Sequence, residues 1–138
     1  MSSESTWFVD TSVLVAVVLG ASPTAREWWN SAAADTLLGS RLLEVETKRF
    51  ILNKELAGEL TPGQVVADRY LDKFELLLVD DDLLSEAIAI RQPLRGADAI
   101  HVAAALRIGP AETTFVTHDA QMARASQALG FAVIDPVS

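Results

Sequence analysis

The sequence predicts an α/β fold in which helices cover both faces of a parallel sheet. Five short apolar segments alternate with longer segments that have helical periodicity. The short segments also lack the polar–apolar alternation of a strand with one solvated face, so we expect strands that are buried on both faces. The length of 138 residues, half of them hydrophobic, suits one packed core. We therefore expect residues 1–138 to form a single domain.

Residues that stop helices mark the breaks between elements. Gly20, Gly58, Pro93, Gly109 and Gly130 each follow a helical segment, where a non-helical backbone ends the helix. The strands are expected at 7–9, 36–39, 75–79, 114–117 and 132–134, and the helices at 12–19, 23–33, 41–56, 61–71, 81–91, 97–108 and 120–129.

The start of the expected helix 61–71 has a capping pattern. Thr61 can cap the helix, Pro62 suits its first position, and the side chain of Gln64 can return a hydrogen bond to the cap residue. This pattern predicts a helix that runs to about Leu71.

Acidic residues follow two of the expected strands. Asp10 comes directly after the segment 7–9, and Asp119 lies two residues after the segment 114–117. Ligands of parallel sheets bind beyond the carboxyl ends of the strands, so these two carboxylates converge if their strands are neighbours. Each Asp also precedes a helix, and N-capping is the alternative explanation for either one alone.

Two glutamates of the helix 41–56 have different surroundings. At about 100° per residue, Glu46 lies on the apolar face of the helix. Its neighbours there are Leu42, Leu43 and Phe50. A carboxylate on such a face needs a metal or a partner, and an ion pair with Arg49 is the alternative. Glu44 lies beside Arg41 and Lys48, on what we expect to be the solvated face.

Asp98 begins an apolar helix that we expect to be buried. Its position in the first turn is also explained by the helix dipole, which favours an acid there. His101 lies one turn later on the same face. We expect this histidine to be packed or hydrogen-bonded more readily than to bind a metal directly.

Four carboxylates in one place would repel one another, and a hard divalent cation relieves this repulsion. Mg²⁺ prefers oxygen ligands, Mn²⁺ accepts the same donors, and either ion can activate water at a phosphodiester. The candidate site is therefore Asp10, Glu46, Asp98 and Asp119. The net charge of −8 is unusual for a protein that binds phosphates, although bound cations can reverse the sign of an acidic pocket.

Several classes of protein are excluded or disfavoured. The absence of cysteine excludes disulfides and a cysteine-ligated zinc site. The polar residues 1–6 show no secretory signal, and the apolar run 13–19 is too short to cross a bilayer. We expect a protein of the cytoplasm that has no contact with a membrane.

Four segments, in order, resemble the PIN-domain family, and most of all its VapC-type toxins. They are 9–12 with Asp10, 40–49 with Glu46 and Arg49, 94–106 around Asp98 and His101, and 116–119 with Asp119. The resemblance spans almost the whole chain. It implies a three-layer α/β/α fold with a five-stranded parallel sheet in the order 3-2-1-4-5.

The resemblance also implies a function: endonucleolytic cleavage of RNA that depends on Mg²⁺ or Mn²⁺. The four acidic residues would form the catalytic and metal site, with the hydroxyls of Ser12 and Thr117 in support. The substrate would be a structured RNA such as tRNA or ribosomal RNA. A cognate antitoxin and a homodimer are the implied protein partners.

Three other classes of protein share some of these features. A phosphoacceptor receiver domain, with acids at 80–82, needs a lysine after a late strand, but no lysine follows Lys73. A haloacid-dehalogenase-type phosphatase needs a second Asp at position 12, which is Ser, and no glycine-rich phosphate loop is present. A catalytically silent PIN-like binding module stays open, although all four acids are present. Trp28 and Trp29 could mark a partner surface, but core packing is the commoner role of such residues.

Overall fold

The computed structural model describes residues 5–138, so the polar stretch 1–6 lies mostly outside the described residues. Its strands are β1 (Thr6–Val9), β2 (Thr36–Ser40), β3 (Phe74–Leu77), β4 (Thr114–Val116) and β5 (Ala132–Ile134). Its helices are α1 (Thr11–Leu19), α2 (Pro23–Ala32), α3 (Arg41–Leu56), α4 (Asp68–Leu71), α5 (Asp81–Ala89), α6 (Gly96–Ile108) and α7 (Ala120–Ala128).

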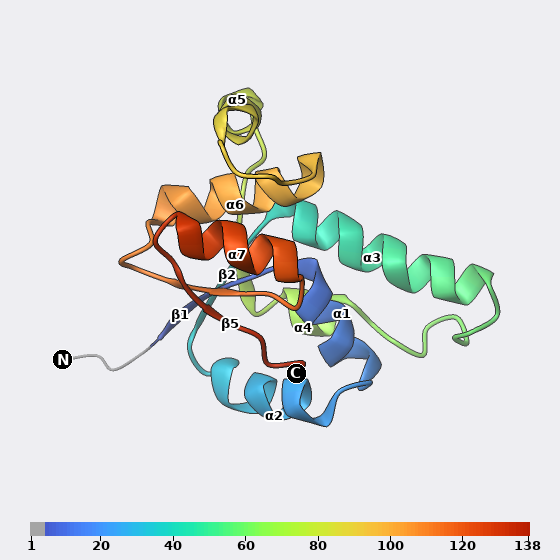
Figure 1. Ribbon diagram of the computed structural model, residues 1–138. Coiled ribbons are helices and arrows are strands. Elements are labelled where there is room, and N and C mark those ends of the chain that lie inside the picture. Colours follow the sequence, from blue (N-terminus) through green and yellow to red (C-terminus); the bar gives the residue numbers. More distant parts are fainter. Residues whose placement is uncertain (1–4) are drawn as a thin grey trace.

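The five strands form one parallel sheet in the order β3-β2-β1-β4-β5, which confirms the expected fold class. Figure 1 shows α6 and α7 on one side of this sheet and α1, α2 and α4 on the other, with α5 beyond α6. The order of strands reverses at β1, whose neighbours are β2 and β4. In parallel sheets such a reversal opens a crevice for ligands at the carboxyl ends of the strands.

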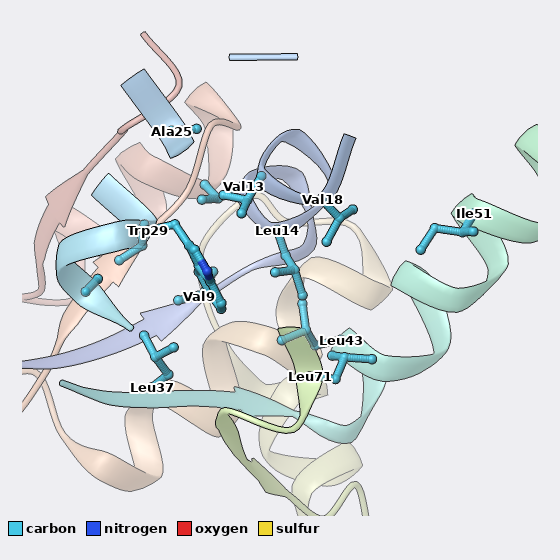
Figure 2. Close-up of a cluster of buried hydrophobic side chains, with 13 residues drawn as sticks. Val9, Val13, Leu14, Val18, Ala25, Trp29, Leu37, Leu43, Ile51 and Leu71 are labelled. Atoms are coloured by element: carbon cyan, nitrogen blue, oxygen red, sulfur yellow. The ribbon is translucent and has the colours of Figure 1, made fainter. Parts of the chain in front are cut away.

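Each face of the sheet has its own apolar core. Successive residues of β1 point to opposite faces, so Phe8 joins the core under α5, α6 and α7, where its ring stacks on Phe115 at 5.6 Å between centroids. Val9 points to the other core, which Figure 2 shows between the sheet and α1, α2, α3 and α4. Both residues are completely buried. Burial on both faces explains why the strands do not alternate in polarity.

The aromatic pair on α2 belongs to the second of these cores. The side chain of Trp29 is 5% exposed and its ring stacks on Phe74, with 5.9 Å between centroids. Trp28 packs edge-on against Trp7 at 5.8 Å. The core interpretation of these tryptophans is therefore confirmed.

The expected helix 61–71 was wrong over most of its length, because only α4 is helical there. The backbone N–H of Thr61 does donate to the side chain of Gln64 at 3.1 Å, as the capping pattern predicts. Gly63, however, has a φ of +81°, a left-handed conformation that stops a right-handed helix. The helix α5 likewise ends at Ala89, because Ile90 has an extended backbone.

The acidic run 80–82 lies at the start of α5. The carboxylate of Asp80 accepts a hydrogen bond from the backbone N–H of Leu83 at 2.8 Å and so caps α5. Within residues 5–138, no helix has both the length and the apolar character needed to cross a bilayer.

Candidate active site

The candidate site lies at the carboxyl edge of the two central strands. The strands β1 and β4 are paired in register, with Val9 opposite Val116. The backbone N–H of Asp10 donates to the carbonyl of Val116 at 3.0 Å, which extends this pairing by one residue. The turns that carry Asp10 and Asp119 are therefore neighbours, the condition that the sequence left open.

The carboxylate of Asp10 is 2% exposed and is held by two hydroxyls. Ser12 Oγ donates to Oδ1 at 2.6 Å, and Thr117 Oγ1 donates to Oδ2 at 2.7 Å. Burial raises the pKa of Asp10 and outweighs the opposing effect of these hydrogen bonds. Although Asp10 stands at the N-cap position of α1, its side chain makes no capping hydrogen bond of ordinary geometry. The two hydroxyls are therefore the main partners of this carboxylate.

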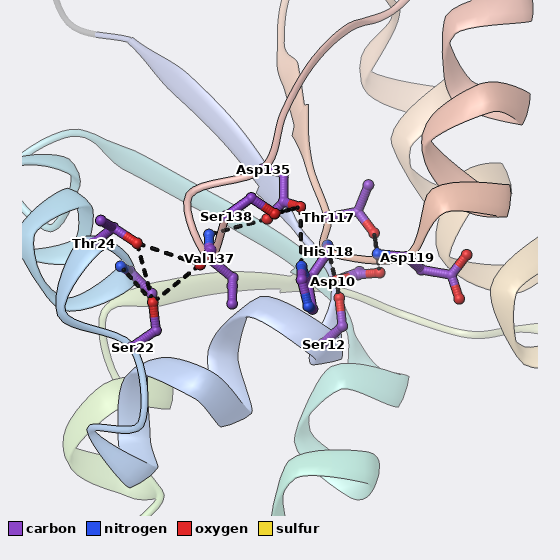
Figure 3. A network of polar contacts seen from close by, with 11 residues as sticks. Asp10, Ser12, Ser22, Thr24, Thr117, His118, Asp119, Asp135, Val137 and Ser138 are labelled. Atoms are coloured by element: carbon purple, nitrogen blue, oxygen red, sulfur yellow. Dashed lines mark hydrogen bonds and ion pairs between the residues drawn. The ribbon is translucent and has the colours of Figure 1, made fainter.

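The same two hydroxyls also tie the neighbouring turns together, as Figure 3 shows. Ser12 Oγ accepts a hydrogen bond from the backbone N–H of His118 at 2.9 Å, and Thr117 Oγ1 accepts one from the N–H of Asp119 at 3.0 Å. Asp119 caps α7 in the ordinary way, because its Oδ1 accepts from the N–H of Met122 at 2.8 Å. The structure thus places both hydroxyls beside Asp10.

An exposed polar contact borders this turn. His118 Nδ1 lies 2.9 Å from Asp135 Oδ2, and Ser138 Oγ donates to the same carboxylate at 2.7 Å. Burial tends to raise the pKa of Asp135, but the contacts with His118 and Ser138 outweigh it and hold that pKa below its usual value. The side chain of His118 therefore interacts with the segment after β5.

Glu46 reaches the site from α3. Thr11 Oγ1 donates to Glu46 Oε1 at 2.6 Å, and His101 Nε2 lies 2.6 Å from the same oxygen. Burial tends to raise the pKa of Glu46, but the hydrogen bonds with His101 and Thr11 outweigh it and lower that pKa. The buried residues of α3 are Leu43, Thr47 and Ile51. Glu46 is partly exposed and so lies at the edge of the buried face.

Glu44 is not the more solvated of the two glutamates, because its side chain is 26% exposed and that of Glu46 is 32% exposed. The carboxylate of Glu44 forms ion pairs with Arg41 at 3.0 Å and Lys48 at 3.3 Å. The alternative partner of Glu46, Arg49, instead donates to Asn53 Oδ1 at 3.3 Å. The expected difference in exposure was therefore wrong, and the two glutamates differ instead in their partners: Arg41 and Lys48 for Glu44, Thr11 and His101 for Glu46.

Asp98 is the least restrained of the four acids. It lies in the first turn of α6 and accepts no hydrogen bond from residues 5–138. Burial raises the pKa of Asp98, and the negative charges of Asp119 and Glu46 raise it further. These three carboxylates are thus close enough to repel one another.

The sequence identified His101 but not its partners. The ring is 1% exposed, with Nδ1 at 3.1 Å from Ser40 Oγ and Nε2 on Glu46. The expectation of a hydrogen-bonded histidine is confirmed. The position of His101 one turn after Asp98 was the available signal. Thr11 and Ser40 had none, since a single hydroxyl at the start of a helix is common.

The acidic residues suit a divalent cation by their chemistry. Glu46 Oε2, Asp119 Oδ2 and both oxygens of Asp98 accept no hydrogen bond from residues 5–138. Burial raises the pKa values of Asp10 and Asp98, so their charged forms are disfavoured as the side chains lie. As the side chains lie, no three acidic or histidine residues of the described part come close enough to hold an ion.

Comparison with known proteins identifies the family of the chain. Residues 7–128 match the model of the PIN domain, a range that contains all four acids. This chain belongs to the PIN-domain family. It is also 31% identical over 135 residues to ribonuclease VapC47 of Mycobacterium tuberculosis, covering 94% of this chain and 96% of the relative. The PIN domain described here is therefore of the VapC ribonuclease type, as the sequence resemblance implied.

Solved structures agree with the PIN fold. VapBC2 of Rickettsia felis, bound to promoter DNA, matches with a TM-score of 0.69 at 12% identity, over 94% of this chain and 98% of the other. PAE2754 of Pyrobaculum aerophilum matches at 0.66 with 19% identity, over 96% and 92%. A toxin–antitoxin complex of Klebsiella pneumoniae matches at 0.63 with 16% identity, over 94% and 96%.

Proposed function

We propose that this PIN domain is a metal-dependent endoribonuclease and the toxin of a toxin–antitoxin pair. The observation that carries the proposal is that Asp10 and Asp119 follow the paired strands β1 and β4, with Asp98 near enough to Asp119 for their charges to repel, in a chain of VapC type. Asp10 and Asp98 would bind the cation most directly, while Asp119 and Glu46 would complete the site or orient waters. Bound Mg²⁺ or Mn²⁺ would supply Lewis acidity and a more acidic water for hydrolysis of a phosphodiester.

The chain's own residues prepare the site for this chemistry. Ser12 and Thr117 fix both oxygens of Asp10, so this carboxylate needs little rearrangement to act as a ligand. Asp98 and Asp119 repel each other, which favours the approach of a counter-ion. The acidic surface thus becomes compatible with an RNA backbone only when a cation is present.

We propose a structured RNA, such as tRNA or ribosomal RNA, as the substrate, acted on in the cytoplasm. Hydrolysis by water leaves 5′-phosphate and 3′-hydroxyl ends, whereas a histidine mechanism that uses the 2′-hydroxyl leaves a 2′,3′-cyclic phosphate. The surroundings of the two histidines support hydrolysis by water. His101 is buried with both ring nitrogens engaged, and His118 interacts with Asp135.

The test is incubation of the purified protein with total RNA, with Mg²⁺, with Mn²⁺ and with EDTA, followed by mapping of the cut ends. Cleavage that requires the cation and leaves 5′-phosphates supports the proposal. Full activity in EDTA, or cyclic phosphate ends, overturns the carboxylate–metal mechanism. Intact RNA under all conditions would favour a silent binding module instead.

The proposed partners are a cognate antitoxin and a second copy of this chain. The toxin–antitoxin nature of the Klebsiella relative supports the first. An Arg or Lys of the antitoxin would pair with the acidic cluster in place of the cation. Measurement of the mass in solution tests the homodimer, and a monomer at micromolar concentration would contradict it. The antitoxin is tested by adding the co-expressed partner protein to the cleavage assay. Loss of RNA cleavage supports its role.

A further inference from the structure

We propose that His101 is a positioning residue that, together with Thr11, holds Glu46 by one oxygen and leaves the other oxygen for the active site. This inference rests on the proposed function. It assigns a task to a buried histidine that lies outside the set of four acids. A divalent cation, or a water bound beside it, is the ligand that the free oxygen would contact.

Both hydrogen bonds converge on the same atom. Thr11 Oγ1 and His101 Nε2 each lie 2.6 Å from Glu46 Oε1. A carboxylate oxygen has two lone pairs, so two donors fill the capacity of Oε1. Oε2 accepts no hydrogen bond within residues 5–138. The side chain is therefore restrained without losing its ability to bind a ligand.

The partners of the ring fit the tautomer that this task requires. An ionised carboxylate can only accept, so the contact of 2.6 Å with Glu46 Oε1 requires a hydrogen on His101 Nε2. Ser40 Oγ, which accepts from the backbone N–H of Leu42 at 3.2 Å, can donate its own hydrogen to Nδ1 at 3.1 Å. Because the ring is 1% exposed, water does not compete for either nitrogen.

The contact also joins elements that would otherwise place their acids independently. His101 and Asp98 lie one turn apart on α6, whereas Glu46 lies on α3 and Thr11 begins α1. The ring of His101 is therefore a direct link between the helix that carries Asp98 and the side chain of Glu46. The alternative is a purely structural tie between helices, which would affect stability but not the binding of a cation.

Two amide substitutions distinguish these roles. In His101→Gln the amide nitrogen takes approximately the place of Nε2 and can still donate to Glu46, whereas in His101→Asn it takes the place of Nδ1 and reaches only toward Ser40. Binding of Mn²⁺ by the purified protein is measured by calorimetry, beside RNA cleavage and thermal unfolding. We expect His101→Asn to weaken Mn²⁺ binding about 10- to 100-fold, the usual effect of losing an outer-shell partner of a ligand.

His101→Gln should recover most of that loss. Thr11→Val should weaken binding by a smaller factor, because the buried ring of His101 still holds Glu46 from α6. In the background of Glu46→Gln, His101→Asn should add no further loss, since the two changes act through one carboxylate. Glu44→Gln is the control for a carboxylate of the same helix that forms ion pairs with Arg41 and Lys48. Should one histidine variant fail to fold, Thr11→Val still tests the same oxygen.

The outcomes separate this inference from the function on which it rests. If His101→Asn lowers the melting temperature but leaves the Mn²⁺ dissociation constant and cleavage at wild-type values, the positioning role is wrong. Equal losses for the Asn and Gln variants would also contradict it. If wild-type protein binds no Mn²⁺ and cleaves no RNA, the proposed function fails first.

Discussion

The two sides of the acidic cluster are built in different ways. On the strand side, Asp10 is buried and both of its oxygens accept hydrogen bonds from the hydroxyls of Ser12 and Thr117. On the helix side, Asp98 has no hydrogen-bond partner within residues 5–138, and Glu46 is held by a single oxygen. The strand side is thus organised in advance, whereas the helix side retains unsatisfied negative charge.

This difference shows which parts of the site stabilise the fold and which carry a charge that the fold disfavours. The hydroxyl pair around Asp10 stabilises the fold and the site together, because it also joins the turns after β1 and β4. The raised pKa of Asp98 shows that its charge is unfavourable in the metal-free protein. Removal of a supporting hydroxyl should therefore lower stability, whereas neutralising a carboxylate whose pKa is raised should not, although both kinds of substitution reduce cleavage.

The largest expected effect on activity is that of Asp10→Asn. The change keeps the shape of the side chain but removes its charge, so RNA cleavage should fall by at least about 100-fold. Because burial raises the pKa of Asp10, a neutral side chain should be easier to bury, and the melting temperature should not fall. A gel assay of cleavage and a thermal melt check both parts, and wild-type cleavage would contradict the strand-side assignment.

Glu46→Gln should also abolish cleavage while the fold survives, because only the charge is lost. Glu44→Gln is the matched control on the same helix. Its exposed ion pairs are worth at most about 1 kcal/mol, so activity should change little. Equal losses from the two substitutions, or loss only at Glu44, would refute the argument from the helical face.

Thr117→Val should destabilise the fold as well as slow the reaction. It removes the donor to Asp10 and the acceptor of the Asp119 N–H, both in a buried setting. Loss of these bonds should cost about 1–3 kcal/mol of the free energy of unfolding, measured by urea denaturation. Ser138→Ala, which removes an exposed hydroxyl, is the control and should change stability by less than about 0.5 kcal/mol.

The smallest expected effect is that of Asp98→Asn on the helix side, which should raise the stability of the fold slightly. The raised pKa of Asp98 in the folded state means that the unfolded state releases this proton at lower pH. Wild type should therefore lose stability relative to Asp98→Asn as the pH rises from the usual Asp range through the raised folded value. Above that value the deficit stays constant. Because the side chain is partly exposed, the difference should stay below about 1 kcal/mol.

Addition of Mn²⁺ should reverse that order, since a ligand that binds only the folded state raises its stability. Wild type should gain melting temperature with the cation, whereas Asp98→Asn should gain less. Thermal melts at fixed pH with and without Mn²⁺ make this comparison. An equal gain in both proteins would remove Asp98 from the metal site.

The sequence was sufficient for features that depend on local patterns. Buried strands and the ends of helices at glycine predicted the layers, whereas the helical face did not predict the relative exposure of Glu46 and Glu44. The order of the strands needed the family resemblance, because nothing in the residues of β4 states that it pairs with β1. The failure at 61–71 has a local cause, since a good capping pattern was overridden by the conformation of Gly63.

The partners of His101 were beyond local reasoning for a different reason. Its contacts with Ser40 and Glu46 join residues that are 61 and 55 positions apart. Helical periodicity indicates a face but not the side chain that meets it from another helix. Such contacts depend on how α3 and α6 pack, which only the three-dimensional structure shows.

The hydrogen bond between Thr117 and Asp10 also has a consequence in time. Its two residues are separated by 107 positions, so the strand side of the site cannot assemble until nearly all of the PIN domain has been synthesised. At about 5–20 residues per second, this leaves an interval of roughly 5–20 seconds between the appearance of Asp10 and that of Thr117. The set of four acids is therefore incomplete on the ribosome until Asp119 has been synthesised.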